Sequence, residues 1–426
     1  MRRTSLRELI CLNAYWPGLS FMWNSLHLII LPAVLLGFVA DARKNTVLGL
    51  LTFAGLMVAL VTQPLSGALS DAWPSRLGRR RPLLILGTIF DMLFLALIAT
   101  APDLTTLAVG YIGLQFTSNV AHGPAQGLMH DRVPADQMGL ASGIKNLFDM
   151  GGMVISSLAV GRLLSPQDPD ARGVITLVAA ILLAGLALTA FGVREASSRP
   201  APGAVSLRER LRASFRVDVR GNRHYWRLIW SRLLFLLSVY GIQAFAQYYV
   251  RDTLPSANPV QLTGDLMAAI VLALVGFSVL GGYLCDRYGR KPMHVVAALL
   301  VACGSLLLLT ARSATSVLIF GAITGAGMGV YITANWALAN DLAPQGQAGK
   351  FLGLTNLATA GAAAISRLTG PGIDALNALH PGQNLGYAAL FAGGAILSLI
   401  SLFWLRGIPD FRRARAEALP EATSSR

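Results

Sequence analysis

Ionisable side chains occur inside long apolar segments of this 426-residue chain. A charge at the centre of a membrane helix costs on the order of 2.5–3.5 kcal/mol, so each of these residues is a functional candidate. The residues able to exchange a proton are Asp91, Asp149, His27 and His122. Asp91 follows Pro82 by nine residues, about 13 Å of helix rise, which predicts a position near the middle of a bilayer. Burial there favours proton binding by a carboxyl group, and a structural carboxyl group bonded to neighbouring helices is the alternative.

The other proton-exchange candidates also have structural interpretations. Asp149 follows a lysine by four residues, so an ion pair along one helix face would neutralise both groups. A histidine can titrate near neutral pH, but a lone histidine on a helix is more often a packing residue. Asn24 and Asn119 each lie three residues before one of the histidines, on roughly the same helix face. We therefore predict that the two Asn–His pairs line one cavity.

Polar and aromatic residues recur at helical spacing in the second half of the chain. Tyr240, Gln243 and Gln247 occupy positions i, i+3 and i+7 and would form a polar stripe. A second set, which adds an aromatic face, is Tyr331, Asn335 and Trp336. Hydroxyl and amide groups bind sugar hydroxyls, so we predict a substrate site here, with contacts between helices as the alternative. We expect Arg232 and Arg367, near predicted helix ends, to extend to the membrane interface and to bind no ligand.

The composition indicates that the helices that carry these residues face lipid. Hydrophobic residues make up 54% of the chain and charged residues only 13%, against about a quarter in soluble proteins. Apolar stretches near the ~20 residues needed to cross a bilayer follow one another with short polar breaks. We predict an all-α membrane protein of twelve transmembrane helices, at residues 13–39, 46–70, 82–101, 105–129, 140–164, 173–193, 225–251, 264–285, 292–312, 314–340, 350–373 and 385–406.

The net charge of +14 is explained by topology better than by nucleic-acid binding, because the basic residues lie between apolar spans. An alternating path places five basic clusters on one side, which predicts that both termini are cytoplasmic. We expect the first helix to be retained in the protein and not removed as a signal peptide. The composition, rich in Arg, Ala and Gly, indicates that the protein lies in the plasma membrane of a bacterium. The five clusters are Arg2 to Arg7, Arg76 to Arg81, residues 194–224, Arg287 to Lys291, and Arg412 to Arg415.

An internal repeat divides the chain. A shift of 210 positions superimposes HDRVPADQMGLASGIKNL on NDLAPQGQAGKFLGLTNL, with Pro, Asp, Gln, Gly and Asn all in register. A constant offset over so many residue types indicates a duplicated bundle. We therefore predict two pseudo-symmetric six-helix bundles, at 1–193 and 225–406, joined by a cytoplasmic linker at 194–224 and followed by a tail at 407–426.

Both halves also contain one loop motif, GALSDAWPSRLGRRRP after the second predicted helix and GYLCDRYGRKP after the eighth. The first glycine allows close helix approach, the carboxylate can pair with arginine, and proline can begin the next helix. With the repeat, these loops resemble the signature of the major facilitator superfamily, although Ala72 replaces a usual basic residue. The resemblance implies monomeric transporters that work by alternating access. It also implies gating roles for Gly67, Asp71, Arg79, Arg80, Asp131, Gly282, Asp286, Arg290, Lys291 and Asp341.

The segments QPLSGALSDAWPSRLGRRRP and SNVAHGPAQGLMHD are most similar to sucrose–proton and related glycoside–cation symporters. This similarity implies a small-molecule substrate, a sugar or glycoside, taken up with a cation, a proton before sodium. A proton-antiport exporter of amphipathic or drug-like compounds is the alternative, and a receptor or membrane enzyme fits two intact gating loops less well. The sequence contains no nucleotide-binding loop, metal cluster or nucleophile elbow, so we expect no cofactor, metal or enzymatic activity.

Overall fold

A computed structural model describes residues 3–72, 75–164, 171–193, 195, 222–343 and 348–408. Every regular element in these ranges is helical, so the predicted all-α class is confirmed. Eight of the described helical spans are long and apolar enough to cross a membrane, and a bent pair would make nine. The remaining helices of spanning length carry more polar side chains: α6 (Leu104–Arg132), α7 (Met138–Leu163) and α15 (Ala348–Arg367). In chain order the helices correspond to the twelve predicted spans.

The first span begins at Leu6, earlier than the predicted residue 13, because Ser5 caps it and its hydroxyl accepts the Glu8 N–H. The span is not one regular helix. Its consecutive parts are α1 (Leu6–Asn13), α2 (Tyr15–Ser25), a π-helical turn η1 (Leu26–Ile30) and α3 (Leu31–Leu35). Turns of this wider kind are rare and occur often at functional sites.

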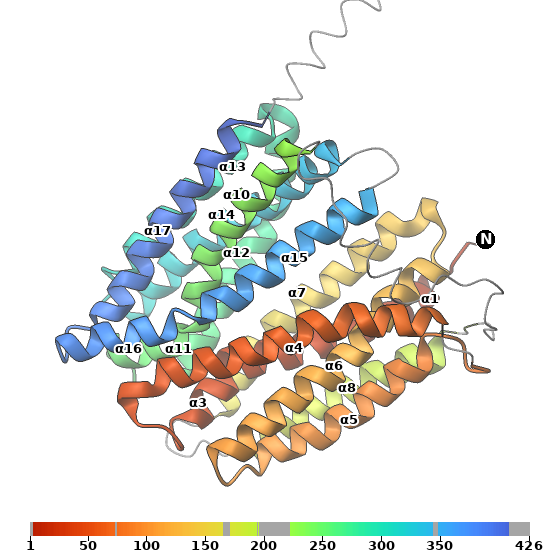
Figure 1. The fold of residues 1–426 in the computed structure, drawn as a ribbon, viewed down its shortest axis with the longest axis horizontal. Coiled ribbons are helices and arrows are strands. Elements are labelled where there is room, and N and C mark those ends of the chain that lie inside the picture. Colours follow the sequence, from red (N-terminus) through yellow and green to blue (C-terminus); the bar gives the residue numbers. More distant parts are fainter. Residues whose placement is uncertain are drawn as a thin grey trace, which may run out of the picture. The chain divides into compact units, whose positions relative to one another are not determined.

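Contacts group the chain into two compact units, and unit 1 comprises Met1–Arg216, Ala244–Ala268 and Arg367–Gln383. Within unit 1, α6 packs against α4 (Lys44–Ala72) and α5 (Arg81–Ala99) (Figure 1). In the same unit, α2 packs against α7 and α8 (Arg172–Gly192). Unit 1 also includes the short 3₁₀ turns η2 (Asp41–Arg43) and η3 (Ala135–Gln137), with α11 (Ala246–Thr253), the start of α12 (Pro259–Tyr288) and α16 (Gly370–Leu379).

Unit 2 comprises Val217–Gln243, Ala269–Ser366 and Asn384–Arg426. Its helices are α10 (Arg223–Ala244), the rest of α12, α13 (Arg290–Leu308), α14 (Ala314–Leu342), α15 and α17 (Leu385–Arg406). Within this unit α13 packs against both α14 and α17. A capping box at Ser313 begins α14, where the hydroxyl accepts the N–H of Ser316.

Two predicted continuous helices are broken. The predicted helix 225–251 is interrupted at Phe245, which separates α10 from α11. α15 ends at Arg367, and α16 begins with Pro371 in its first turn, where proline is tolerated because its missing N–H is not needed. The six-plus-six division remains a prediction from the repeat. The following stretches lie outside the described residues: residues 194 and 196–221 of the predicted linker 194–224, the loop 165–170, residues 344–347 of the second repeat copy, and the tail from residue 409.

Candidate functional site

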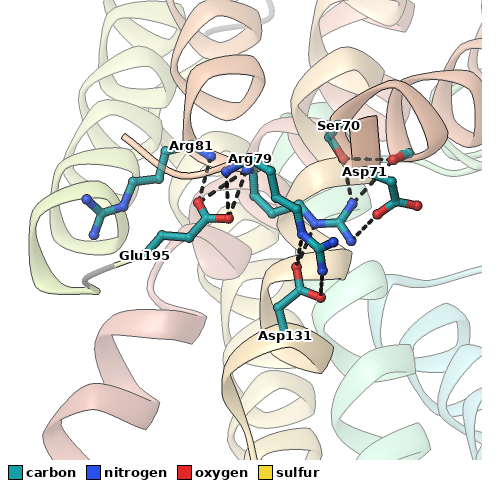
Figure 2. Close-up of polar contacts among 8 residues, drawn as sticks. Ser70, Asp71, Arg79, Arg81, Asp131 and Glu195 are labelled. Carbon is teal, nitrogen blue, oxygen red and sulfur yellow. Dashed lines mark hydrogen bonds and ion pairs between the residues drawn. The ribbon is translucent and has the colours of Figure 1, made fainter. Parts of the chain in front are cut away.

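The loop between α4 and α5 meets the end of α6 in a charged network (Figure 2). Arg79 and Arg80 both donate to Asp131, with Nε–Oδ2 distances of 3.0 and 2.8 Å. Arg80 is buried; it also pairs with Asp71 at 2.5 Å and donates to the Ser70 hydroxyl at 2.5 Å. Hydrogen bonding to Asp131 raises the pKa of Arg79. The gating residues that the resemblance implied for the first half therefore meet in one network.

Glu195, just beyond α8, binds the same loop from another side (Figure 2). Its carboxylate accepts the backbone N–H groups of Arg79 at 2.9 Å, Arg80 at 3.0 Å and Arg81 at 3.2 Å. These amides open α5 and have no partner inside that helix, so a carboxylate there compensates the positive helix end. Sequence reasoning missed Glu195, because its partners lie more than a hundred residues away; an acidic residue at a predicted helix end was the available signal.

The second half repeats the central ion pair. Arg290, at the start of α13, pairs with Asp341 near the end of α14 and donates to the Ala337 carbonyl at 2.9 Å. The 210-residue shift maps Arg80 onto Arg290 and Asp131 onto Asp341. One interaction is thus present in both copies of the repeat.

The other predicted gating residues of the two loop motifs lie outside these ion pairs. Lys291 donates to the Ile408 carbonyl at 2.5 Å, and Asp286 is exposed on the last turn of α12. Gly282 lies near Thr333, whose methyl group would be 3.6 Å from an added Cβ. Gly67 faces a closer neighbour, because a Cβ on Gly123 of α6 would lie 2.7 Å from the Gly67 nitrogen. The close approach of α4 and α6 therefore depends on the missing side chain of Gly123, whereas a Cβ added at Gly67 itself would meet no heavy atom within 4 Å.

A second polar network lies at the opposite end of α4, within unit 1. Lys44 pairs with Asp252 at 2.6 Å, and Arg251 with Asp41 at 2.7 Å. Nearby, the Asp374 carboxylate of α16 accepts from the Asn45 amide at 2.8 Å and the Thr46 N–H at 2.7 Å. None of these residues was predicted, since their partners are distant in sequence and no repeated motif marks them.

Asp91 is fully enclosed in unit 1, at 0% exposure. Its Oδ1 accepts from the Thr117 hydroxyl at 2.6 Å, and its Oδ2 has no hydrogen-bond partner among the described residues. The nearby Tyr15 hydroxyl forms a hydrogen bond with the Thr88 hydroxyl at 3.0 Å and interacts electrostatically with Asp91. No described cation forms an ion pair with Asp91.

Asp149 and His122 share a half-buried cluster. Lys145 pairs with Asp149 at 2.6 Å along α7, and Ser20 donates to the other carboxylate oxygen at 2.8 Å. The Lys145 ammonium lies 3.9 Å from the Trp16 ring centroid, and Trp16 also contacts His122 edge-on at 5.2 Å. Two of the four proton candidates are therefore brought together, and the ion pair named as the alternative for Asp149 is present.

His27 lies on the π-helical turn in a different cluster. Its Nε2 bonds to the Tyr111 hydroxyl at 2.8 Å, and the Gln115 amide donates to that hydroxyl at 2.7 Å. Trp23 stacks on the His27 ring at 5.1 Å. Arg367 interacts electrostatically with both His27 and Tyr111. We call Trp23, His27, Tyr111, Gln115 and Arg367 the His27 cluster.

A comparable cluster in unit 2 surrounds Arg232. The guanidinium donates to Thr359 at 3.0 Å and to Asn335, and lies 5.3 Å from the Trp336 ring. Asn335 also donates to the Tyr331 hydroxyl at 3.0 Å. The candidates on α14 thus gather around a buried arginine of α10. The expectation that Arg232 and Arg367 reach the interface is wrong, because packing encloses both.

The other substrate candidates have varied surroundings. Asn24 holds α2 against α7 by donating to Ser156 and Ser157 at 2.6 and 2.8 Å, and Asn119 donates to a carbonyl of its own helix. With its nitrogen directed toward η1, the Gln247 amide donates to the Leu28 and Ile29 carbonyls at 2.8 and 3.0 Å. Half-buried Tyr240 and Gln243 lie on α10 of unit 2, so the predicted stripe is divided between the units.

Helical spans that carry buried polar clusters and charged loop networks define a polytopic membrane transporter. The chain belongs to the Major Facilitator Superfamily, whose family model matches residues 12–366 and 256–425. A crystal structure of a D-xylose–proton symporter has a similar fold, with a TM-score of 0.72 and 16% identity over 94% of this chain and 98% of that one. The predicted family is confirmed, and it is a family of transporters and not of enzymes.

Curated relatives carry several kinds of names. The minor myo-inositol transporter of Bacillus subtilis (strain 168) is 28% identical over 39% of this chain, and the match spans only 36% of that protein. The glucuronide carrier protein homolog of Escherichia coli (strain K12) is 23% identical over 69% of this chain and 67% of its own. The multidrug resistance protein MdtL of Salmonella heidelberg (strain SL476) is 30% identical over 36% of this chain and 40% of its own.

Proposed function

We propose that this protein is a secondary active transporter that takes up a sugar or glycoside together with a proton. The observation that carries the coupling is the carboxyl group of Asp91, which is enclosed in unit 1 with a threonine hydroxyl and no described cation. An isolated buried carboxylate is costly, and uptake of a proton removes the charge. Asp91 therefore has the properties of a group that gains and loses a proton during a transport cycle.

Two polar clusters support a polyhydroxylated substrate. The His27 cluster combines hydroxyl, amide, imidazole and indole groups, and the Arg232 cluster combines hydroxyl, amide, guanidinium and indole groups. Both combinations suit sugar hydroxyls and the apolar face of a ring. Relatives named for inositol and glucuronide transport agree with this substrate class. The fold by itself does not select a substrate, so these side chains are the stronger support.

The charged networks at the two ends of α4 supply contacts for alternating access. We infer that the Arg79–Arg80–Asp131 network and the Lys44–Asp252 network form and break in alternate states of the cycle. Ion pairs suit this use, because a pair that is separated and rehydrated loses little net free energy. A monomer in a bacterial plasma membrane, with both termini cytoplasmic, completes the proposal.

The test is proton flux in proteoliposomes that contain the full chain and an internal pH dye, with a panel of mono- and disaccharides added outside. We expect a sugar to cause internal acidification, and Asp91→Asn to abolish the proton movement. Asp136→Asn is the matched control, because Asp136 is an exposed carboxylate whose ion pair within the described residues is with exposed Arg3 at 3.6 Å. Acidification that persists in Asp91→Asn would move the coupling role to Asp149 and its neighbours.

Export of amphipathic compounds by proton antiport is the second candidate, and the similarity to a multidrug resistance protein favours it. This activity would leave the sugar panel silent. In inside-out vesicles with an imposed proton gradient, a hydrophobic dye would instead be accumulated with loss of protons from the lumen. That pair of results would replace sugar uptake with export.

A further inference from the structure

The His27 cluster contains a buried positive charge for which the described part of the chain supplies no anion. Arg367 is 7% exposed, and its Nε and Nη1 atoms have no hydrogen-bond partner among the described residues. The position of Arg367 is fixed by packing, because a Cβ on Gly49 of α4 would lie 2.3 Å from the Arg367 carbonyl oxygen. The backbone of Arg367 is therefore held against α4, and its buried guanidinium keeps two donor atoms without a partner among the described residues.

An enclosed arginine is costly because its guanidinium does not lose its proton in proteins. The acidic residues that face α4 from α11 and α16 have other partners. Asp374 accepts from Asn45 and Thr46, and Asp252 pairs with Lys44. An anion that compensates Arg367 must come from outside the described chain.

The neighbours of Arg367 are suited to a polyhydroxylated ligand. Tyr111, His27 and Gln115 are joined by hydrogen bonds of 2.7–3.2 Å and offer neutral donors and acceptors. Trp23 and His27 are half-buried, so the described side chains do not enclose the cluster completely. The stacked ring pair also presents an aromatic surface.

Arg232 of unit 2 is a buried arginine in the same chain whose side-chain donors have hydrogen-bond partners. Its Nε and Nη1 atoms, which correspond to the free atoms of Arg367, donate to Thr359 and Asn335. Neutral side chains therefore meet the hydrogen-bonding needs of Arg232. Arg367 lacks this arrangement, which singles it out as a ligand-binding group.

We propose that Arg367 binds an anionic oxygen group of the substrate, and that the substrate is an acidic sugar whose hydroxyls bind Tyr111, His27 and Gln115. The proposal rests on the sugar-transport function proposed above and specifies its substrate class. A carboxylate and a phosphate ester present the same type of oxygen pair to a guanidinium. The binding experiment distinguishes a carboxylate from a phosphate ester.

Binding is measured by thermal stabilisation of the purified full chain, because a ligand that binds the folded state raises its stability. The probes are D-glucuronate, glucose 6-phosphate and D-glucose. We expect one of the two anions to bind about 10- to 100-fold more tightly than glucose, the range for a charge-assisted hydrogen bond. The better anion assigns the group as a carboxylate or a phosphate ester.

The variants are Arg367→Gln, which removes the charge, and Arg367→Lys, which keeps it without the planar donor pair. We expect Arg367→Gln to lose the preference for the anion while glucose binding changes less than about threefold, and Arg367→Lys to be intermediate. Arg312→Gln removes an exposed arginine before α14 and is expected to change neither affinity.

The proposal would be overturned if glucose bound as tightly as the better anion, or if neither anion bound detectably. These measurements need only the native chain, so they decide the question even if Arg367→Gln does not fold. Equal losses for anion and glucose in a folded Arg367→Gln protein would also overturn it and leave Arg367 a structural residue. Sugar-driven proton flux without anion preference leaves the proposed transport function standing. Anion binding without any transport would instead refute the transport function and retain the anion site.

Discussion

At the scale of single residues, the two ion pairs near the start of α4 differ chiefly in burial. The Lys44 and Asp252 side chains are 7% and 17% exposed, whereas those of Arg251 and Asp41 are 33% and 65% exposed. Removing one partner of an enclosed pair leaves an uncompensated charge, and removing one partner of an exposed pair leaves a hydrated one. The two pairs therefore differ in what they contribute to stability.

We predict that Lys44→Gln lowers the free energy of unfolding by about 2–4 kcal/mol, and Arg251→Gln by less than about 1 kcal/mol. Reversible unfolding of the purified protein by SDS, at fixed detergent composition, measures both values. Asp252→Asn in the Lys44→Gln background should restore part of the loss, because it removes the carboxylate that has lost its ion pair with Lys44. Equal costs for Lys44→Gln and Arg251→Gln would contradict this assignment.

Glu195 provides a second prediction at the residue scale. Its carboxylate accepts three consecutive amides at the start of α5, so Glu195→Ala should lower the free energy of unfolding by about 1–2 kcal/mol. Thermal unfolding in detergent provides the comparison, with Asp136→Asn as an exposed acidic control. Unchanged stability in Glu195→Ala would show that water replaces the carboxylate without loss.

At the scale of elements, contact between α4 and α6 depends on glycine. A Cβ on Gly123 would lie 2.6 Å from the Gln63 carbonyl oxygen and 2.7 Å from the Gly67 nitrogen, both of which are backbone atoms of α4. Backbone atoms cannot rotate away as a side chain can, so the helices must separate.

We predict that Gly123→Ala costs about 1–3 kcal/mol of unfolding free energy. Gly151→Ala is the matched control, because no heavy atom lies within 4 Å of a Cβ at Gly151 of α7, and alanine is favoured over glycine in a helix. SDS unfolding of both variants compares them directly. A Gly123→Ala protein as stable as the Gly151→Ala protein would show that α4 and α6 adjust at no cost.

At the scale of the whole molecule, α4 relates the two charged networks to the membrane. Its 29 residues correspond to about 43 Å of helix, close to the full thickness of a bilayer with its headgroups. The Lys44 network and the Arg79 network therefore belong on opposite faces of the membrane. The basic loop that contains Arg79 is expected on the cytoplasmic face.

Single-cysteine labelling tests this topology. In a chain with Cys11, Cys285 and Cys303 changed to serine, Ala42→Cys should react with an impermeant maleimide added to intact cells. Arg76→Cys should react only after the membrane is opened. Both positions are exposed in the structure, so the reversed pattern would show that the orientation predicted from the basic loops is wrong.

The sequence by itself determined the features that depend on local or periodic information. Apolar runs near bilayer length predicted the order of the helices, because lipid requires each spanning segment to satisfy its own backbone. Spacing along one helix named the pair of Lys145 and Asp149, and the repeat offset related Arg80 and Asp131 to Arg290 and Asp341. Each of these inferences needed only neighbours on one helix or a comparison of the chain with itself.

Only the tertiary structure decided which residues became partners across helices. Lys44 and Asp252 are 208 positions apart, and Glu195 lies more than a hundred positions from the amides it binds. Arg367 was expected at the membrane interface because it is near a helix end, yet its side chain is buried and its backbone lies against Gly49 of α4. Burial and the choice of partner depend on how helices pack, and no local pattern of residues encodes that packing.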